Sequence, residues 1–271
     1  MNNLLKISNL SFKYEGEHIL KNINFENSTG KLTGVIGPNG AGKSTLFRLI
    51  TGTLSPTNGE IIIGDQNVSK LSVKNRAKLV SLVPQNPEIP STLSVYETVL
   101  FGRHPYTNFL GWENQKDLDA TNESLKLTKI QHLAKRKIQT LSGGEKQKVL
   151  ISMSVAQNTP ITLLDEPTSN LDIDNQILIL DTIKNLQKNN HSFLISLHDL
   201  NLASLYCDEL ILLSKGEIIT IGSPKSVLTE ENIKRAYNTE IKILEHPLYN
   251  TPIITPVISN PSSNINKFYL N

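Results

Sequence analysis

The stretch 37–45, GPNGAGKST, constrains the fold of this 271-residue chain more than any other. Gly37, Gly42, Lys43 and Ser44 satisfy the pattern G-x-x-x-x-G-K-[S/T]. A short apolar segment at 33–36 precedes the pattern, and apolar residues at helical spacing follow it. This strand–loop–helix context is the one in which the pattern forms a phosphate-binding loop. We therefore expect an α/β fold built around that loop.

The chemistry of such a loop follows from its residue types. Glycines let backbone N–H groups turn toward phosphates without side-chain clashes, and the helix N-terminus adds a favourable dipole. We expect Lys43 to reach the β- and γ-phosphates and the Ser44 hydroxyl to bind Mg²⁺. A glycine turn that only caps a helix is the alternative, which the strand–loop–helix context disfavours. The residues expected to contact the nucleotide here are Gly37, Pro38, Asn39, Gly40, Ala41, Gly42, Lys43, Ser44 and Thr45.

A pair of acids, Asp165 and Glu166, follows the apolar segment 161–164. Ligands of open α/β sheets bind at the carboxyl ends of strands. Two neighbouring carboxylates are costly there without a nearby cation, which a magnesium–nucleotide complex would supply. We expect Asp165 to hold the metal through water and Glu166 to orient and polarise the attacking water. Two solvated acids at a strand end are the alternative.

The segment LSGGE at 141–145 suggests a second phosphate-binding element. Ser142 and Glu145 have capping-box spacing, so a well-capped helix is the simplest interpretation. The pair Gly143–Gly144 indicates a function beyond capping. Each glycine lowers helix propensity by about 1 kcal/mol, and a cap needs only one such residue. The benefit of the pair is close approach of backbone N–H groups to an anion. Since the phosphate loop is already complete, we expect that anion to be the γ-phosphate of a nucleotide on another subunit.

Segments of alternating polarity at 6–12 and 19–25 predict antiparallel strands, and later strands alternating with helices predict a mainly parallel sheet. Residues from about 86 to 141 have helical spacing, with Ser94 and Glu97 as a capping box and a loop from Arg103 to Trp112. We expect one ATPase domain over 1–240, with the helical subdomain inserted at about 86–141. The extension 241–271 is expected to form a hairpin around Asn250 and then a flexible tail.

Composition excludes several classes of protein. The net charge of +2 does not by itself indicate a nucleic-acid partner. The one cysteine, Cys207, excludes an internal disulfide and a cysteine metal cluster. No apolar run approaches the roughly 20 residues that cross a bilayer, and the N-terminus does not resemble a signal peptide. If the protein works at a membrane, we expect another chain to supply the membrane part.

The ordered motifs resemble those of the nucleotide-binding subunits of ABC transporters over almost the whole chain. Besides the elements above, the match includes Tyr14, Gln85 in VPQ, SNLD at 169–172 and His198. The sequences VYETVLFGRHPY, EPTSNLD and LHDLNLA are similar to those of importer ATPases for ferric siderophores, haem and cobalamin. The resemblance therefore implies a P-loop NTPase with a mainly parallel core sheet, an antiparallel β-subdomain and an inserted helical subdomain.

The resemblance also implies roles for single residues, with ATP and Mg²⁺ as cofactors. Tyr14 would stack on adenine, and Gln85 would contact Mg²⁺ or the attacking water. His198 would bond the γ-phosphate, and Asp172 would lie at a dimer interface. The alternatives are a strand-edge aromatic for Tyr14, a polar residue after Pro84 for Gln85 and a structural histidine for His198. Asp172 would serve equally well as the N-cap of a helix over 172–189.

By the same resemblance, the chain would hydrolyse ATP for an importer at the cytoplasmic face of the cell membrane. Its partners would be a second copy packed head to tail, an integral membrane permease and, indirectly, an extracytoplasmic substrate-binding protein. No nucleic-acid partner is expected. The region 86–112 would meet the permease, with Phe101, Tyr106, Phe109 and Trp112 either forming the docking surface or packing inside the helical subdomain.

Four alternatives remain weaker. A soluble ABC ATPase acting on nucleic acid or ribosomes usually carries two ATPase units, a coiled-coil insertion or a basic arm. A non-hydrolysing, nucleotide-gated interaction module would not need Glu166 and His198. A zinc site is disfavoured because His191 and His198 have the wrong spacing and no cysteines assist. A dinucleotide-binding fold is disfavoured because GPNGAG lacks G-x-G-x-x-G.

Overall fold

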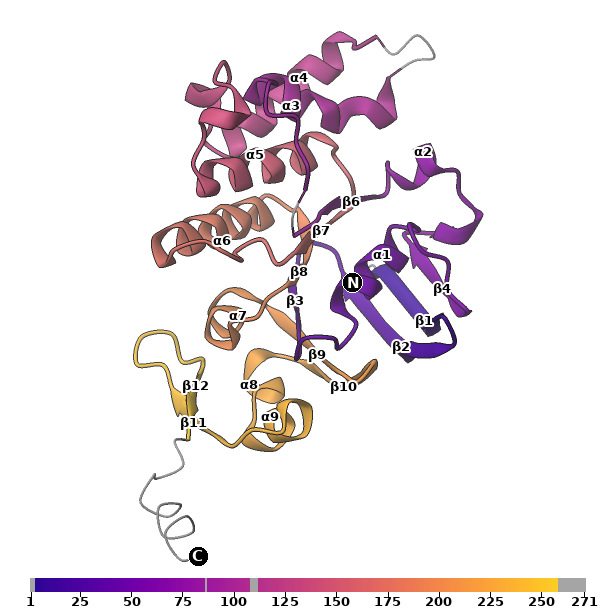
Figure 1. Ribbon diagram of the computed structural model, residues 1–271, viewed down its shortest axis with the longest axis vertical. Coiled ribbons are helices and arrows are strands. Elements are labelled where there is room, and N and C mark those ends of the chain that lie inside the picture. Colours follow the sequence, from indigo (N-terminus) through magenta and orange to yellow (C-terminus); the bar gives the residue numbers. More distant parts are fainter. Residues whose placement is uncertain (1–2, 86, 108–111, 258–271) are drawn as a thin grey trace, which may run out of the picture.

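The computed structural model describes residues 3–85, 87–107 and 112–257. Its central element is a six-stranded sheet with the order β10-β9-β3-β8-β7-β6 (Figure 1). Neighbouring strands run parallel except at the edge, where β10 is antiparallel to β9. The strands are β3 (Leu32–Ile36), β6 (Val80–Val83), β7 (Ile161–Asp165), β8 (Ser192–Ser196), β9 (Glu209–Ser214) and β10 (Glu217–Gly222). Every residue of β3, β7 and β8 is buried, as expected for parallel strands covered on both faces.

A second, antiparallel sheet has the order β2-β1-β4-β5. Its strands are β1 (Asn3–Tyr14), β2 (Glu17–Ser28), β4 (Asn58–Ile63) and β5 (Gln66–Asn67), so the two antiparallel strands predicted from alternation are confirmed. Helix α1 (Lys43–Ile50) packs its apolar side chains into the core that joins this sheet to the parallel one. Short helices η1 (Val68–Lys70) and α2 (Val73–Arg76) lead from β5 to β6.

Helices predominate between β6 and β7, and most of them contribute to a separate apolar core. They are α3 (Val95–Leu100), η2 (Phe101–Tyr106), α4 (Gln115–Leu127), η3 (Gln131–Leu133), η4 (Ile138–Thr140) and α5 (Gly143–Ala156). The predicted capping box of Ser94 and Glu97 is confirmed at the start of α3. Figure 1 shows this helical part at one end of the molecule, with the antiparallel sheet beside the central strands.

The loop predicted from Arg103 to Trp112 is wrong in its first part, where η2 is a 3₁₀ helix. The reason is tertiary, because the buried Arg103 holds this segment against its neighbours. Its Nε donates to Asp117 Oδ1 at 3.0 Å and its Nη1 donates to Ala156 O at 2.7 Å. Its guanidinium also lies 3.9 Å from the centroid of the Tyr106 ring. Residues 108–111 of the predicted loop lie outside the described residues.

The remaining helices are α6 (Ile173–Lys188), α7 (Leu200–Tyr206), α8 (Pro224–Val227) and α9 (Glu230–Tyr237). They are followed by a hairpin of β11 (Ile241–Glu245) and β12 (Pro252–Pro256), whose connection contains Asn250. Asn201 of α7 clamps β12 by accepting from Ile254 N at 2.7 Å and donating to Ile254 O at 3.4 Å. The flexible tail expected beyond this hairpin lies largely outside the described residues.

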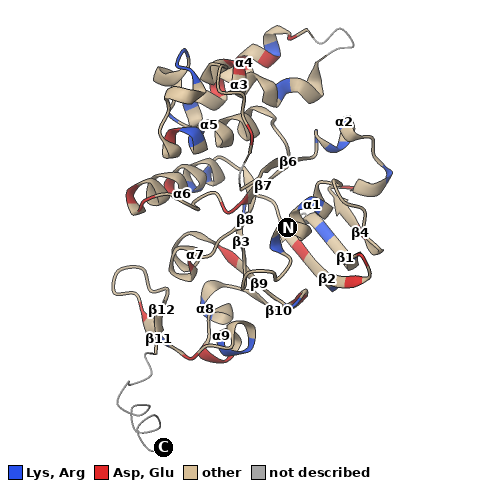
Figure 2. Cartoon of the chain, viewed as in Figure 1, with Lys and Arg blue, Asp and Glu red and all other residues tan. Residues whose placement is uncertain are grey.

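Charge is spread over the whole fold. Basic and acidic residues are interspersed along the ribbon, in keeping with the net charge of +2 (Figure 2). Among the described helices, none combines the length and apolar character needed to cross a bilayer.

Candidate active site

The glycine loop lies between the end of β3 and the start of α1 and forms one wall of a cavity. Gly42 caps α1 with a φ of 103°, in the left-handed region that glycine tolerates best. A Cβ on Gly37 would collide with the carbonyl oxygen of Leu213, so no other residue fits there without a backbone shift. Among the described residues, no side chain caps α1, and the first turn of this helix contains no acidic residue. The N-terminus of α1 is therefore a favourable place for an anion.

Lys43 is 5% exposed, and its ammonium group bends back over this loop. Its Nζ donates to Gly37 O at 2.9 Å and to Pro38 O at 3.2 Å. Burial lowers the pKa of Lys43 from its ordinary 10.5, and the charges of Glu166 and Asp165 oppose that shift. The structure thus brings the predicted cation and the predicted acid pair into one electrostatic group.

The two acids lie at the carboxyl end of β7, as the sequence predicted. Asp165 is 8% exposed, and its Oδ1 accepts a hydrogen bond from Ser196 Oγ at 2.7 Å. At Glu166 the chain turns sharply out of the strand with a φ of 51°, which is rare for a residue other than glycine. The Glu166 N–H donates to the same Ser196 Oγ at 2.8 Å.

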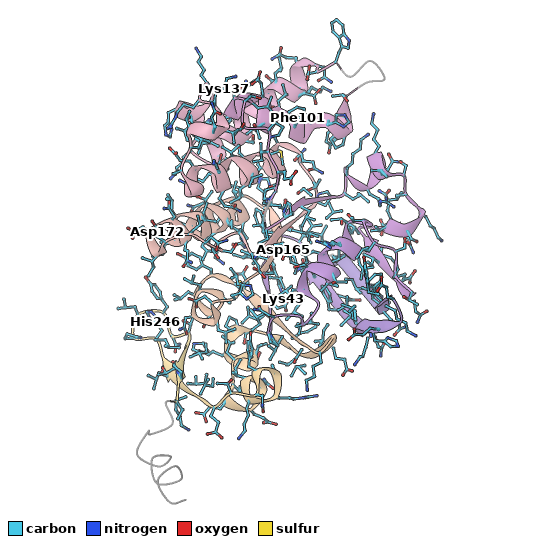
Figure 3. All side chains as sticks on the ribbon, viewed as in Figure 1. Lys43, Phe101, Lys137, Asp165, Asp172 and His246 are labelled. Carbon is cyan, nitrogen blue, oxygen red and sulfur yellow. The ribbon has the colours of Figure 1, made fainter. Side chains whose placement is uncertain are left out.

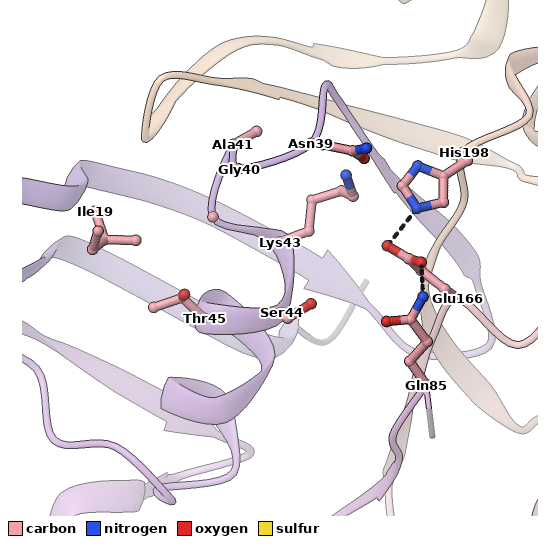
Figure 4. A pocket seen from close by; sticks show the side chains of 11 residues that line it. Ile19, Asn39, Gly40, Ala41, Lys43, Ser44, Thr45, Gln85, Glu166 and His198 are labelled. Carbon is pink, nitrogen blue, oxygen red and sulfur yellow. Dashed lines mark hydrogen bonds and ion pairs between the residues drawn. The ribbon is translucent and has the colours of Figure 1, made fainter. Parts of the chain in front are cut away.

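The Glu166 carboxylate joins three segments that are far apart in the sequence (Figure 4). Its Oε1 lies 2.6 Å from Nε2 of His198, in the turn after β8. Its Oε2 accepts from Nε2 of Gln85, just beyond β6, at 2.5 Å. Because β6, β7 and β8 are adjacent in the sheet, their carboxyl ends bring these side chains together.

The cavity between the loop and these side chains has a volume of about 530 Å³. This size lies within the usual range for small-molecule and cofactor sites. It is lined by Ile19, Asn39, Gly40, Ala41, Gly42, Lys43, Ser44, Thr45, Gln85, Glu166 and His198. Asp165 and Lys43 both lie near the centre of the molecule (Figure 3), and the charge of Asp165 acts on the Lys43 ammonium group.

Other predicted site residues do not line this cavity. Tyr14 ends β1 with 60% of its surface exposed, and its ring packs edge-on against Phe12 with the centroids 6.2 Å apart. Asp172 lies at the outer end of α6 (Figure 3), where its side chain caps the helix by accepting from Asn175 N at 2.9 Å. The N-cap interpretation of Asp172 is therefore confirmed.

Ser142 to Glu145 also lie outside this cavity, at the start of α5. Ser142 and Glu145 form the predicted capping box, in which Ser142 Oγ accepts from Glu145 N at 3.2 Å. The two glycines differ, because Gly143 is exposed whereas Gly144 is buried against Asn175 of α6. A Cβ on Gly144 would lie 2.7 Å from Asn175 Cγ, so this glycine has a packing reason within its own chain.

The aromatic residues proposed for docking have different environments. Phe101 is 56% exposed and Trp112 is 71% exposed, whereas Tyr106 is half-buried and donates to Asn158 O at 3.3 Å. Phe109 lies outside the described residues. A cavity of about 300 Å³ adjoins Phe101 and is lined by Leu93, Glu97, Leu100, Phe101, His104, Thr107 and Glu113.

Sequence reasoning missed two residues of this region. Ile19 contributes to the cavity wall from β2, and no feature of the sequence distinguishes it from other strand residues. Ser196 bonds both acids, and its signal was a polar residue directly after the apolar run 193–195, two positions before His198. Within the described residues, no three His, Cys, Asp or Glu side chains cluster as a metal centre.

The chain is similar to several known proteins. Residues 20–169 match the family model of the ABC transporter domain, which is more than half of the chain. The cobalamin import ATP-binding protein of Halobacterium salinarum is 34% identical over 96% of this chain, which spans only 65% of that relative's length. The ferric enterobactin transport ATP-binding protein of Escherichia coli is 35% identical over 93% of the chain and 94% of its own length. A hemin import ATP-binding protein of Gloeobacter violaceus is 34% identical over 94% of both.

Two solved structures agree with the fold. One, from an inward-facing ABC transporter described as of the metal-chelate type, has a TM-score of 0.83 and 29% identity, covering 95% of this chain and 98% of its own. Another is a dimeric bacterial ABC transporter cassette with a TM-score of 0.70 and 28% identity, covering 81% of this chain and 98% of its own. The predicted P-loop NTPase fold is confirmed. Taken with the family match over more than half of its length, these likenesses show that the chain belongs to the ABC transporter family, whose members bind ATP.

Proposed function

We propose that this chain is the ATP-hydrolysing subunit of an ABC importer for a ferric-siderophore, haem or cobalamin-type substrate. The observation that carries the hydrolytic part is the meeting of Glu166, Gln85 and His198 opposite the phosphate loop in one cavity. The substrate class rests on the relatives, which are named for cobalamin, ferric enterobactin and hemin import. The substrate itself would pass through a separate permease.

The triphosphate would lie along the loop 37–45, with its β- and γ-phosphates at Lys43. Ser44, Asp165 and Gln85 supply a hydroxyl, a carboxylate and an amide oxygen, the hard oxygen donors that Mg²⁺ prefers. Bound there, Mg²⁺ would neutralise charge on the phosphate oxygens. Tyr14 offers an exposed ring on which adenine can stack.

Glu166 is the residue best placed to orient and polarise the attacking water. Both of its carboxylate oxygens are engaged, one with His198 and one with Gln85, so its position is defined from two sides. His198 would donate to the γ-phosphate, and Gln85 would contact the metal ion or the water. Positioning and electrostatic stabilisation supply most of the catalysis in phosphoryl transfer, so small displacements of these groups should be costly.

A second copy would complete each site. Ser142, Gly143, Gly144 and Glu145 start α5, outside the cavity that holds their own chain's phosphate loop. Gly143 is exposed there, so its N–H can approach a phosphate held by another protomer. In a head-to-tail dimer, Asp172 would lie at the interface. ATP drives closure only if the closed dimer binds it more tightly than the open one, and this shared contact supplies that difference.

The importer role requires an integral membrane permease, with the ATPase bound peripherally at the cytoplasmic face of the membrane. The exposed Phe101 and Trp112 and the neighbouring cavity of about 300 Å³ make the region 86–112 the proposed contact surface. An extracytoplasmic substrate-binding protein would act indirectly through the permease. A soluble ABC ATPase acting on nucleic acid or ribosomes remains the alternative function. Copurification with a polytopic membrane protein supports the importer, whereas copurification with RNA contradicts it.

Replacing the proposed base tests the hydrolytic role. Glu166→Gln should leave ATP binding intact and lower the hydrolysis rate by about 10²- to 10⁴-fold. Glu60→Gln is the matched control, because Glu60 is an exposed carboxylate of β4 that does not line the cavity of the phosphate loop. Turnover of Glu166→Gln within a fewfold of the control would remove Glu166 from its proposed role.

A further inference from the structure

Strand β8 ends in Ser196, whose side chain is fully buried beside the acid pair. A hydroxyl buried in this way is costly unless its hydrogen-bonding capacity is used. The parallel register places Ser196 directly opposite Asp165, on the last rung that β7 and β8 share. Ser196 is therefore the last residue of β8 before the turn that carries His198.

The hydroxyl of Ser196 makes two bonds that differ in direction. It donates its single proton to Asp165 Oδ1 at 2.7 Å and accepts the Glu166 N–H at 2.8 Å. The first bond engages Oδ1, one of the two carboxylate oxygens of Asp165, and so limits the rotation of that carboxylate. The second bond ties the backbone of Glu166 to β8. One buried group thus orients both acids.

The backbone of Glu166 explains why such a tie is needed. With a φ of 51° this residue is in the left-handed region, which residues other than glycine occupy at a cost in free energy. Its N–H points to a side chain, Ser196 Oγ, instead of to a backbone carbonyl of the neighbouring strand. The hydroxyl therefore supports the turn that directs the Glu166 carboxylate toward His198 and Gln85.

We propose that Ser196 is a positioning residue for hydrolysis, acting through Asp165 and Glu166. This inference rests on the proposed ATPase function. Removing the hydroxyl frees the direction of the Asp165 carboxylate and loosens the Glu166 turn. The proposed base, Glu166, and the proposed metal ligand, Asp165, are then no longer held in a fixed position relative to each other. The phosphate loop and Lys43 remain in place. The loss should accordingly appear in turnover and much less in ATP affinity.

The same strand offers a matched control. Ser192, at the other end of β8, is also buried and accepts a hydrogen bond from a backbone N–H, that of Gly30 at 2.9 Å. Ser192→Ala therefore removes a comparable bond from the same strand far from the acid pair. A second pair, Ser196→Thr and Ser196→Val, keeps the side-chain shape equal and varies only the hydroxyl.

The experiment measures kcat, KM for ATP, thermal unfolding and amide hydrogen exchange of the nucleotide-free protein. For Ser196→Ala we expect kcat to fall about 10- to 100-fold, with KM changed by less than about threefold. Exchange at the Glu166 N–H should rise at least about tenfold, because its acceptor is gone. Ser192→Ala should lower the unfolding temperature as much as Ser196→Ala does, without changing kcat or exchange at the Glu166 N–H. Ser196→Thr should have a higher kcat than Ser196→Val.

Three results would overturn the proposal: equal kcat for Ser196→Ala and Ser192→Ala, equal kcat for the threonine and valine variants, or unchanged exchange at the Glu166 N–H. None of these results contradicts the proposed ATPase function, which is tested separately by Glu166→Gln. If Glu166→Gln hydrolyses ATP normally, the proposed function fails first. If it is inactive and Ser196→Ala is normal, only the role of Ser196 fails.

Discussion

The adjacent glycines Gly143 and Gly144 have different surroundings, so replacing each by alanine should have different consequences. Gly144 is buried, and a methyl group there would collide with Asn175 Oδ1 and lie 2.7 Å from Asn175 Cγ. Gly143 is exposed, and the nearest atom to its methyl group would be Leu171 Cδ2 at 3.4 Å, an ordinary contact. Gly144→Ala should therefore affect folding, whereas Gly143→Ala should affect only what this surface contacts in an assembly.

The expected magnitude follows from the bonds around Asn175. To admit the methyl group of Gly144→Ala, the Asn175 side chain must turn away and give up its 2.7 Å bond from Nδ2 to Asp172 Oδ1. A hydrogen bond of this kind contributes about 0.5–1.5 kcal/mol, and overpacking costs about 1–3 kcal/mol. Higher helix propensity returns at most about 1 kcal/mol. The free energy of unfolding should fall by about 1–3 kcal/mol for Gly144→Ala and stay equal or rise for Gly143→Ala.

Two assays separate the effects. Urea unfolding of the nucleotide-free protein measures the cost in stability. Sedimentation with Mg-ATP, with Glu166→Gln present in every protein to prevent hydrolysis, measures dimerisation. Gly143→Ala should weaken ATP-dependent dimerisation by at least about tenfold, because its methyl group would separate the backbone N–H from the phosphate by more than hydrogen-bond length.

Two outcomes would refute this reasoning. Normal ATP-dependent dimerisation of Gly143→Ala would show that this backbone does not seal a partner's nucleotide. Unchanged unfolding of Gly144→Ala would show that the Asn175 contact is not a packing constraint. Asn175→Ala provides a further check, since the double variant with Gly144→Ala should lose less stability than the sum of the single variants.

Three further predictions concern binding, pH and packing. Lys43→Ala should abolish useful ATP affinity in a fluorescent-nucleotide titration, and retained micromolar binding would contradict its role. The pKa of Glu145 is lowered, chiefly because the backbone N–H of Ser142 donates to its carboxylate. The ionised carboxylate therefore stabilises the fold above pH 4.5, and this stabilisation is lost as the pH falls through the lowered pKa. Urea unfolding of the wild type and Glu145→Gln should therefore converge at acid pH. Asp117→Ala leaves Arg103 buried without its partner and should cost about 3–5 kcal/mol in the same assay, with a smaller loss in Asp117→Leu/Arg103→Met.

Local signals in the sequence determined much of the fold. The glycine pattern at 37–45, the capping box at Ser94 and the N-cap at Asp172 each depend on residues that are close together in the sequence. The buried strand that ends at Asp165 was equally readable, because apolar runs and periodicity are properties of neighbouring residues. Such short-range features can be predicted without knowing how distant parts of the chain pack.

Tertiary structure decided the rest, because it depends on the order of strands in the sheet. Gln85, Glu166 and His198 meet only because β6, β7 and β8 are neighbours, which no local pattern encodes. The helical conformation around Arg103 likewise depends on a buried ion pair with Asp117, so composition alone suggested a loop. The same holds for Ser196, whose two bonds to the acid pair exist only through the register of β7 with β8. The sequence thus determined which chemical groups are available, and the packing of the parallel strands decided which of them touch.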